Sequence, residues 1–160
     1  YYGDKVMLLN RSNNLVFQFQ TDAFMQYILD GGPMPGSTIS SIQLPEILNI
    51  GAGLSGAFIP YNGKYLFFSA SVENNGSAIA DGDILGSFIG VMPVSRISKK
   101  RKAHRPVCFP LKRDGDFIPV KVEGISMQWT TPGKDGVILL VTDSDGGPSE
   151  LLTLRFELKR

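Results

Sequence analysis

Apolar and polar side chains alternate with a period of two along most of the chain, as they do in strands that bury one face. In residues 64–73 every second side chain from Leu66 to Val72 is apolar, and the positions between carry aromatic or hydroxyl side chains. Further segments repeat the alternation: 118–122, 125–129 and 152–158. The pattern is typical of antiparallel sheets.

Short clusters of Gly, Asn, Asp and Pro separate the alternating segments, and these residue types accept the backbone angles of tight turns. Clear examples are Asn13-Asn14, Asn62-Gly63, Asp114-Gly115 and Pro132-Gly133. The segments between such turns number about ten, at the spacing of sandwiches and barrels.

One short helix is predicted at residues 22–30, because Thr21 or Asp22 can cap it and Gly31-Gly32 can end it. Together the patterns predict an all-β fold, an antiparallel two-sheet sandwich that is jelly-roll-like. We expect about ten strands and at most one short helix.

Length and charge narrow the class of protein. The 160 residues suffice for a core of their own, so 1–160 is interpreted as a single β-sandwich domain. Because the chain starts at Tyr1 rather than Met, we interpret it as excised from a longer chain. The 16 basic and 15 acidic residues give a formal net charge of +1, so no overall preference for nucleic acid is expected. No apolar run reaches the ~18 residues of a membrane span, and no membrane insertion is expected.

The motif Gly51-x-Gly53-x-x-Gly56 has the glycine spacing of a dinucleotide-binding loop. Such a loop must join a strand to a helix, whose N-terminal amides face the pyrophosphate. Here Pro60 and Asn62-Gly63 follow closely and a predicted strand comes next. We therefore interpret the glycines as a corner between strands.

Residue types that often carry catalysis or bind metals lack a supporting pattern. Cys108 is the single cysteine, which excludes an internal disulfide, and its apolar neighbours indicate a small core residue. His104, the single histidine, would need an acid and a hydroxyl beside it to act as a base. The calcium-like start at 143–147 fails at Pro148, where a calcium loop requires glycine. The sequence thus predicts no catalytic residue, no cofactor and no metal.

The densest positive charge lies at residues 98–106, SKKRKAHRP. Arg and Lys donate charge-assisted hydrogen bonds to phosphate, sulfate or sialic acid oxygens. Nearby acidic residues and the absence of interleaved aromatic residues favour a solvated loop as the alternative and disfavour nucleic acid. The candidate ligand-binding residues are Lys99, Lys100, Arg101, Lys102, His104 and Arg105.

The stretch 56–71, GAFIPYNGKYLFFSAS, resembles the core signature of the trimeric jelly-roll heads of the complement-q and tumour-necrosis-factor group. In those heads an aromatic residue begins a strand, a Pro-x-x-Gly corner follows, and an x-Tyr-x-Phe strand crosses the subunit. The matching positions are Phe58, Pro60, Gly63, Tyr65, Phe67 and Phe68. Viral fibre heads and capsid protrusions use similar modules.

The resemblance implies a non-enzymatic head or attachment domain that forms a homo-oligomer, with a trimer favoured, and binds a cell-surface glycan or protein receptor through loops. Tyr65 and Phe67 would then pack against neighbouring subunits. The expected location is a virion surface or the extracellular space. Asn10 and Asn75 begin glycosylation sequons, for which no occupancy is expected.

Three alternatives stay open. A monomeric carbohydrate-binding module would present exposed aromatic residues such as Trp129, Tyr61 or Tyr27. A capsid shell subunit would assemble into large particles and place the basic run against nucleic acid. An enzyme would require His104 to be buried beside an acid and a hydroxyl.

Overall fold

The computed structural model describes residues 3–61, 63–74, 82–97, 103–144 and 147–158. These residues form fifteen strands and two helices, and five of the strands are only two residues long. The elements are β1 (Lys5–Asn10), β2 (Leu15–Gln20), α1 (Thr21–Asp30), β3 (Thr38–Ile42), β4 (Glu46–Ile47), β5 (Ile50–Gly51), β6 (Gly53–Phe58), β7 (Tyr65–Asn74), β8 (Asp83–Pro93), α2 (Val94–Ile97), β9 (Ala103–His104), β10 (Val107–Pro110), β11 (Lys112–Arg113), β12 (Asp116–Phe117), β13 (Lys121–Thr131), β14 (Asp135–Asp143) and β15 (Leu151–Glu157). The prediction of an all-β sandwich is confirmed.

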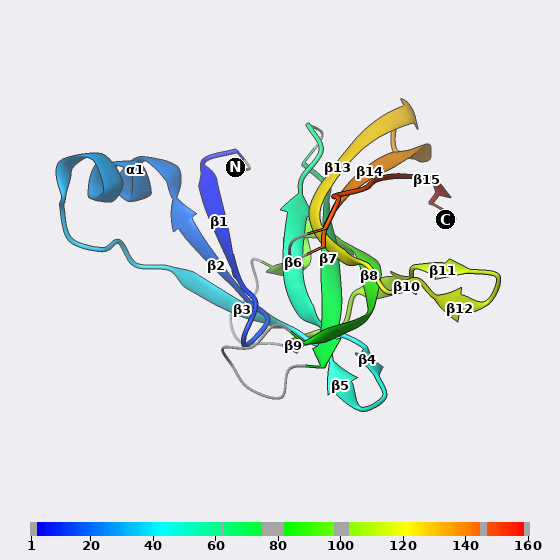
Figure 1. Cartoon of the computed structure of the whole chain (residues 1–160). Helices are drawn as coiled ribbons and strands as arrows, with labels where there is room; N and C mark the ends of the chain where they lie inside the picture. Colours follow the sequence, from blue (N-terminus) through cyan, green and yellow to red (C-terminus); the bar gives the residue numbers. More distant parts are fainter. Residues whose placement is uncertain (1–2, 62, 75–81, 98–102, 145–146, 159–160) are drawn as a thin grey trace.

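The strands form three main sheets (Figure 1). The first sheet has the order β1-β2-β3-β9, the middle sheet β10-β8-β7-β6, and the third sheet β13-β14-β15. Two small hairpins, β4-β5 and β11-β12, complete the described strands. Most neighbouring strands are consecutive in the chain and antiparallel, whereas β3 and β9 are parallel. The sheets are therefore mainly meanders rather than the Greek-key crossings of a jelly roll.

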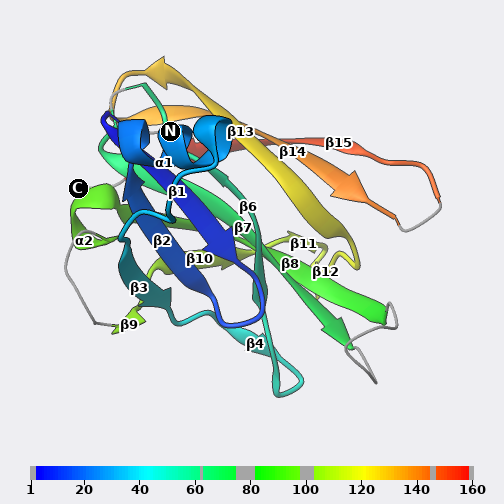
Figure 2. The same ribbon diagram turned by 90° about the vertical axis from the view of Figure 1, so that its left-hand side faces the viewer.

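The first and third sheets cover the two faces of the middle sheet. Successive side chains of β7 point alternately toward one and the other. Leu66 and Phe68 belong to a core shared with the first sheet, which also contains Val16. Phe67 belongs to a second core shared with the third sheet, which also contains Leu140. Two sheets were expected, and the stack in the structure instead has three layers with two cores (Figure 2).

One glycine of the middle sheet is required by this packing. Gly90 is the partner of Phe68 in the register between β7 and β8. A Cβ atom on Gly90 would lie 1.9 Å from Cζ of Phe68, so the aromatic ring occupies the space that any other side chain would need. A larger residue here would displace the ring from the first core.

Helix α1 is confirmed, but its start differs from the prediction. It begins at Thr21, its N-cap residue is Gln20, and no side chain caps it, because the Thr21 side chain already lies inside the helix. The helix ends at Gly31 in the left-handed conformation, with φ of 68°. Phe24 packs on Phe19 of β2 with ring centroids 4.9 Å apart, which fixes α1 against the first sheet.

Helix α2 was not predicted. Its four residues are too few to show a helical period, and they follow Pro93 directly. Val94 and Ile97 are buried in the first core, so the turn closes that core after β8.

Candidate functional site

An apolar groove lies between the middle and third sheets. Its cavity volume is about 710 Å³, and β8 and β10 form one wall while β14 and β15 form the other. Its lining includes Phe67, Ile89, Ile138, Leu154 and Phe156. Ligand pockets commonly have volumes of roughly 300–1,000 Å³ and predominantly apolar walls. The groove has the size and character of a binding site.

The groove exists because the two sheets touch along one side and diverge on the other. Strand β13 contacts β6, β7 and β8 of the middle sheet. Moving away from β13, the third sheet continues through β14 to β15 and the middle sheet continues through β8 to β10. The strands farthest from the contact line therefore border an opening that their side chains do not fill.

Aromatic rings form one end of the groove floor. The ring centroids of Phe67 and Phe156 are 5.4 Å apart, and those of Trp129 and Phe156 are 5.5 Å apart. The indole Nε1 of Trp129 is buried and has no hydrogen-bond partner among the described residues. Since Trp129 is the single tryptophan of the chain, it is a natural optical reporter of this cluster.

Exposed apolar and charged side chains border the opening. Val107 and Phe109 on β10 are each 58% exposed. Lys112, Arg155 and Glu157 also line the groove. The ammonium of Lys112 lies 5.0 Å from the ring centroid of Phe117, a cation–π distance that holds this charge at the rim. The arrangement is an apolar floor with a few charged groups at its edge.

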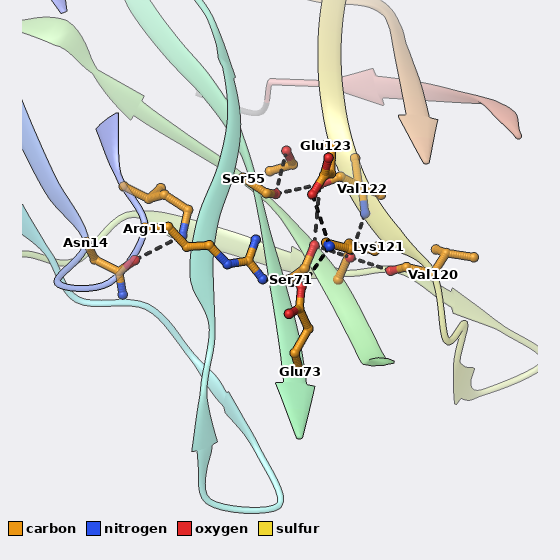
Figure 3. A network of polar contacts seen from close by, with 12 residues as sticks. Arg11, Asn14, Ser55, Ser71, Glu73, Val120, Lys121, Val122 and Glu123 are labelled. Carbon is orange, nitrogen blue, oxygen red and sulfur yellow. Dashed lines mark hydrogen bonds and ion pairs between the residues drawn. The ribbon is translucent and has the colours of Figure 1, made fainter. Parts of the chain in front are cut away.

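A second, smaller pocket of about 270 Å³ is polar and is lined by the β1–β2 turn, the β5–β6 corner and β7. Arg11, from the turn between β1 and β2, pairs with Glu73 of β7 (Figure 3). Lys121 of β13 lies 3.7 Å from the Glu73 carboxylate and 3.4 Å from that of Glu123. The four charges sum to zero and link all three sheets, so the network is a structural junction.

The glycine corner packs against the same junction. Gly51 ends β5 and Gly53 begins β6, so no helix follows the glycines and the interpretation as a corner between strands is confirmed. A Cβ atom on Gly53 would lie 2.8 Å from Cγ of Arg11. The amide of Asn14 donates to the Ala52 carbonyl at 2.9 Å, and its Oδ1 accepts from the Leu54 amide at 2.9 Å. The corner therefore holds the β1–β2 turn against the middle sheet.

Hydroxyl groups of the middle sheet bond to the backbone at and just before the start of β13. Ser87 Oγ donates to the Val120 carbonyl at 2.6 Å, and Ser71 Oγ lies 3.3 Å from the Val122 carbonyl. Ser55 Oγ also donates to that carbonyl (Figure 3). The polar positions of the alternating pattern thus face a backbone rather than solvent.

Two of the six candidate ligand-binding residues, His104 and Arg105, lie among the described residues. Lys99, Lys100, Arg101 and Lys102 lie outside the described residues. His104 is half-buried on β9, and Arg105 follows it with its Nε donating to Oε1 of Gln43 at 2.7 Å.

Phe67 is 1% exposed inside the second core, so the expectation that it packs against a neighbouring subunit is wrong. Tyr65 is half-buried and packs against the same core. Sequence reasoning placed the aromatic face of this strand outward because it did not foresee a third sheet over it.

Cys108 is half-buried beside the first core, as its apolar neighbours suggested. Burial raises the pKa of its thiol to about 11, which disfavours the nucleophilic thiolate. Within the described part of the chain, no three His, Cys, Asp or Glu side chains cluster closely enough to hold a metal ion.

No single local motif marks the apolar groove, because its walls come from strands far apart in the chain. The alternation of Leu152, Leu154 and Phe156 was the available signal for one wall. No helix among the described residues has the length and apolar character needed to cross a membrane.

Comparison with known proteins gives one result. Neither curated proteins nor solved structures yield a match to the chain. A family model, described as a family of unknown function (DUF6929), matches residues 1–156. Since that match covers nearly the whole sequence, the chain belongs to the DUF6929 family.

Proposed function

We propose that the chain is a non-enzymatic binding domain whose ligand occupies the apolar groove between the middle and third sheets. The observation that carries this proposal is the groove itself, with its apolar floor and charged rim. Its volume of about 710 Å³ suits one small molecule or a short extended segment.

The chemistry of the lining selects the ligand class. Phe67, Leu154 and Phe156 favour a ligand whose main part is apolar. Burying an apolar group the size of one such side chain contributes about 1.5–3 kcal/mol to binding. Lys112 and Arg155 outnumber Glu157 at the rim and favour an anionic group at one end of the ligand, because both donate charge-assisted hydrogen bonds. The ligand class is therefore an amphipathic molecule with an anionic end.

The attachment role implied by the resemblance to trimeric heads is compatible with such a groove. A cell-surface ligand with an apolar part and an acidic group would meet both requirements. The basic residues Lys99 to Arg105 stay a separate predicted site for an acidic partner or glycan, tested by removing their charges.

The groove is tested with anilinonaphthalene sulfonate, an aromatic probe that carries an anionic group. Binding is followed by probe fluorescence and by energy transfer from Trp129, whose ring lies 5.5 Å from Phe156. The test variant is Phe109→Glu, which removes apolar contact at the mouth of the groove and repels the anionic probe without touching the core. We expect its affinity to fall roughly tenfold or more, since losing about 1.5–3 kcal/mol of apolar contact corresponds to that range.

The control variant is Tyr61→Glu, which puts the same charge on a fully exposed aromatic side chain that does not line the groove. It should bind the probe as the unmodified protein does. Equal affinity of the Phe109→Glu variant and the control, with both proteins folded by circular dichroism, would contradict the proposal.

A further inference from the structure

The two outer sheets each have an outer face that no described sheet covers, at opposite ends of the stack; on the first sheet, α1 packs on Phe19 of that face. In the middle sheet both faces are covered, as β7 shows. On the third sheet, the outward side chains of β14 and β15 include Val137, Leu139, Val141 and Leu151. Leu139, Val141 and Leu151 are 43%, 48% and 67% exposed, so this face presents apolar side chains to solvent.

The sequence of β14 is that of a strand covered on both faces. Residues 137–141, VILLV, are apolar at five consecutive positions, whereas a strand with one solvated face alternates. Strand β7 provides an internal comparison, because its run YLFF at 65–68 lies between two cores. In β14, Ile138 and Leu140 are buried and their neighbours are not. The pattern indicates that another layer covers the third sheet.

The open face of the first sheet carries a matching apolar row. Register places Leu8 of β1 opposite Phe17 of β2, and Phe17 opposite Ile39 of β3. These positions alternate with Val16, which points into the first core, so the row lies on the outer face. Leu8 and Ile39 are more than two-fifths exposed. An exposed apolar surface across three strands marks an interaction site.

The path of the chain identifies what kind of layer fits these faces. Strand β6 contacts β1 of the first sheet and β13 of the third, so the first strand of each sheet lies near the others. Each sheet is largely a meander that packs its face on the next (Figure 1). Successive blades of a β-propeller have this arrangement.

We infer that the three sheets are an arc of a propeller-like ring, and that a second copy of the chain closes it. The outer face of the third sheet in one copy packs on the outer face of the first sheet in the other, at both junctions. Propellers close with about four to eight blades, so one set of three sheets is too few and two sets fall inside the range. In this pair, each exposed apolar face is covered by an apolar face of the other copy.

Each junction joins two different faces, and a two-fold axis relates the two junctions of the pair. The ring requires two copies, whereas the resemblance to jelly-roll heads favoured three. The groove lies between the middle and third sheets of one copy and is not part of either junction. A solution mass of one chain would therefore reject the two-copy ring without rejecting ligand binding in the groove, and the reverse also holds.

The test measures the mass of the chain in solution by light scattering and sedimentation at several concentrations. The unmodified protein should have twice the 17.5 kDa mass of one chain. Val141→Lys on the third sheet and Ile39→Lys on the first sheet should each reduce the mass to that of one chain. Both side chains are substantially exposed, so the folded chain tolerates them, and circular dichroism checks this.

Two further variants make the result specific. Tyr61→Lys adds the same charge away from both faces and should leave the pair intact. An equal mixture of the Val141→Lys and Ile39→Lys chains retains one unmodified junction and should recover a weaker pair. A single-chain mass for the unmodified protein would overturn the inference. So would loss of pairing with only one of the two face variants, because that result indicates a junction between identical faces.

Discussion

The substitution Phe67→Ala tests whether the aromatic face of β7 belongs to a core or to a subunit surface. Phe67 is 1% exposed, its ring centroid lies 5.4 Å from that of Phe156, and the ring of Trp129 meets it edge-on at 6.2 Å. Truncating a fully buried Phe to Ala typically costs about 3–5 kcal/mol in free energy of unfolding. For a chain of this length, roughly 2–4 °C of melting temperature corresponds to each kcal/mol, so the midpoint should fall by about 10 °C.

The assay is chemical denaturation followed by far-ultraviolet circular dichroism and by the fluorescence of Trp129. Phe109→Ala is the matched control, because Phe109 is the same residue type at 58% exposure and its truncation should change stability by about 0.5 kcal/mol or less. A loss below about 1 kcal/mol for Phe67→Ala would refute the two-core packing, since it would place the ring outside any tight core.

Two other predictions concern the charged junction and the cysteine. The Glu73 side chain is 8% exposed beside Arg11 and Lys121, so Glu73→Gln should lower the free energy of unfolding by about 3 kcal/mol, measured by urea titration. The control Glu123→Gln changes an exposed carboxylate and should lower that free energy by less than about 1 kcal/mol. Equal losses for the two variants would contradict the charged junction. Because burial raises the pKa of Cys108 to about 11, alkylation by iodoacetamide should be slow at pH 8 in the folded protein and fast in urea; equal rates would contradict the burial. The folded state keeps this proton longer than the unfolded state, so the thiol favours folding below pH 9.0 and that contribution is lost as pH rises toward 11.

The strands were predictable because side-chain alternation is a local property. Residues 64–73 and 152–158 alternate in the sequence and correspond, within a residue at each end, to β7 and β15, and Gly31 ends α1 where it was expected to. The two-residue strands, such as β9, were not predictable. A pair that short has no period of its own, and it is defined only by the strand beside it.

The number of layers was not apparent from alternation alone. In β7 the residues between the apolar positions are Phe67, Ser69 and Ser71, which were expected to face outward. They are buried, because Phe67 enters the second core and Ser71 bonds to the backbone of β13. A hydroxyl group can face either water or a buried carbonyl, and only the tertiary structure decides between them.

The candidate groove was out of reach of the sequence for a related reason. Its walls combine β8 and β10 with β14 and β15, and no motif links those segments. The basic run was visible because charge is a compositional feature, but a run of charges does not specify a site. Shape and burial, which define the groove, depend on how the sheets pack.

The most direct test of the three-layer account is the set of nuclear Overhauser contacts made by the adjacent rings of Phe67 and Phe68. Phe67 should contact Trp129 and Phe156 of the third sheet, and an isotope-filtered sample should show that these contacts lie within one chain. Phe68 should contact methyl groups of the first core, such as those of Val16. Contacts from both rings to one sheet, or contacts from Phe67 only to another chain, would contradict it.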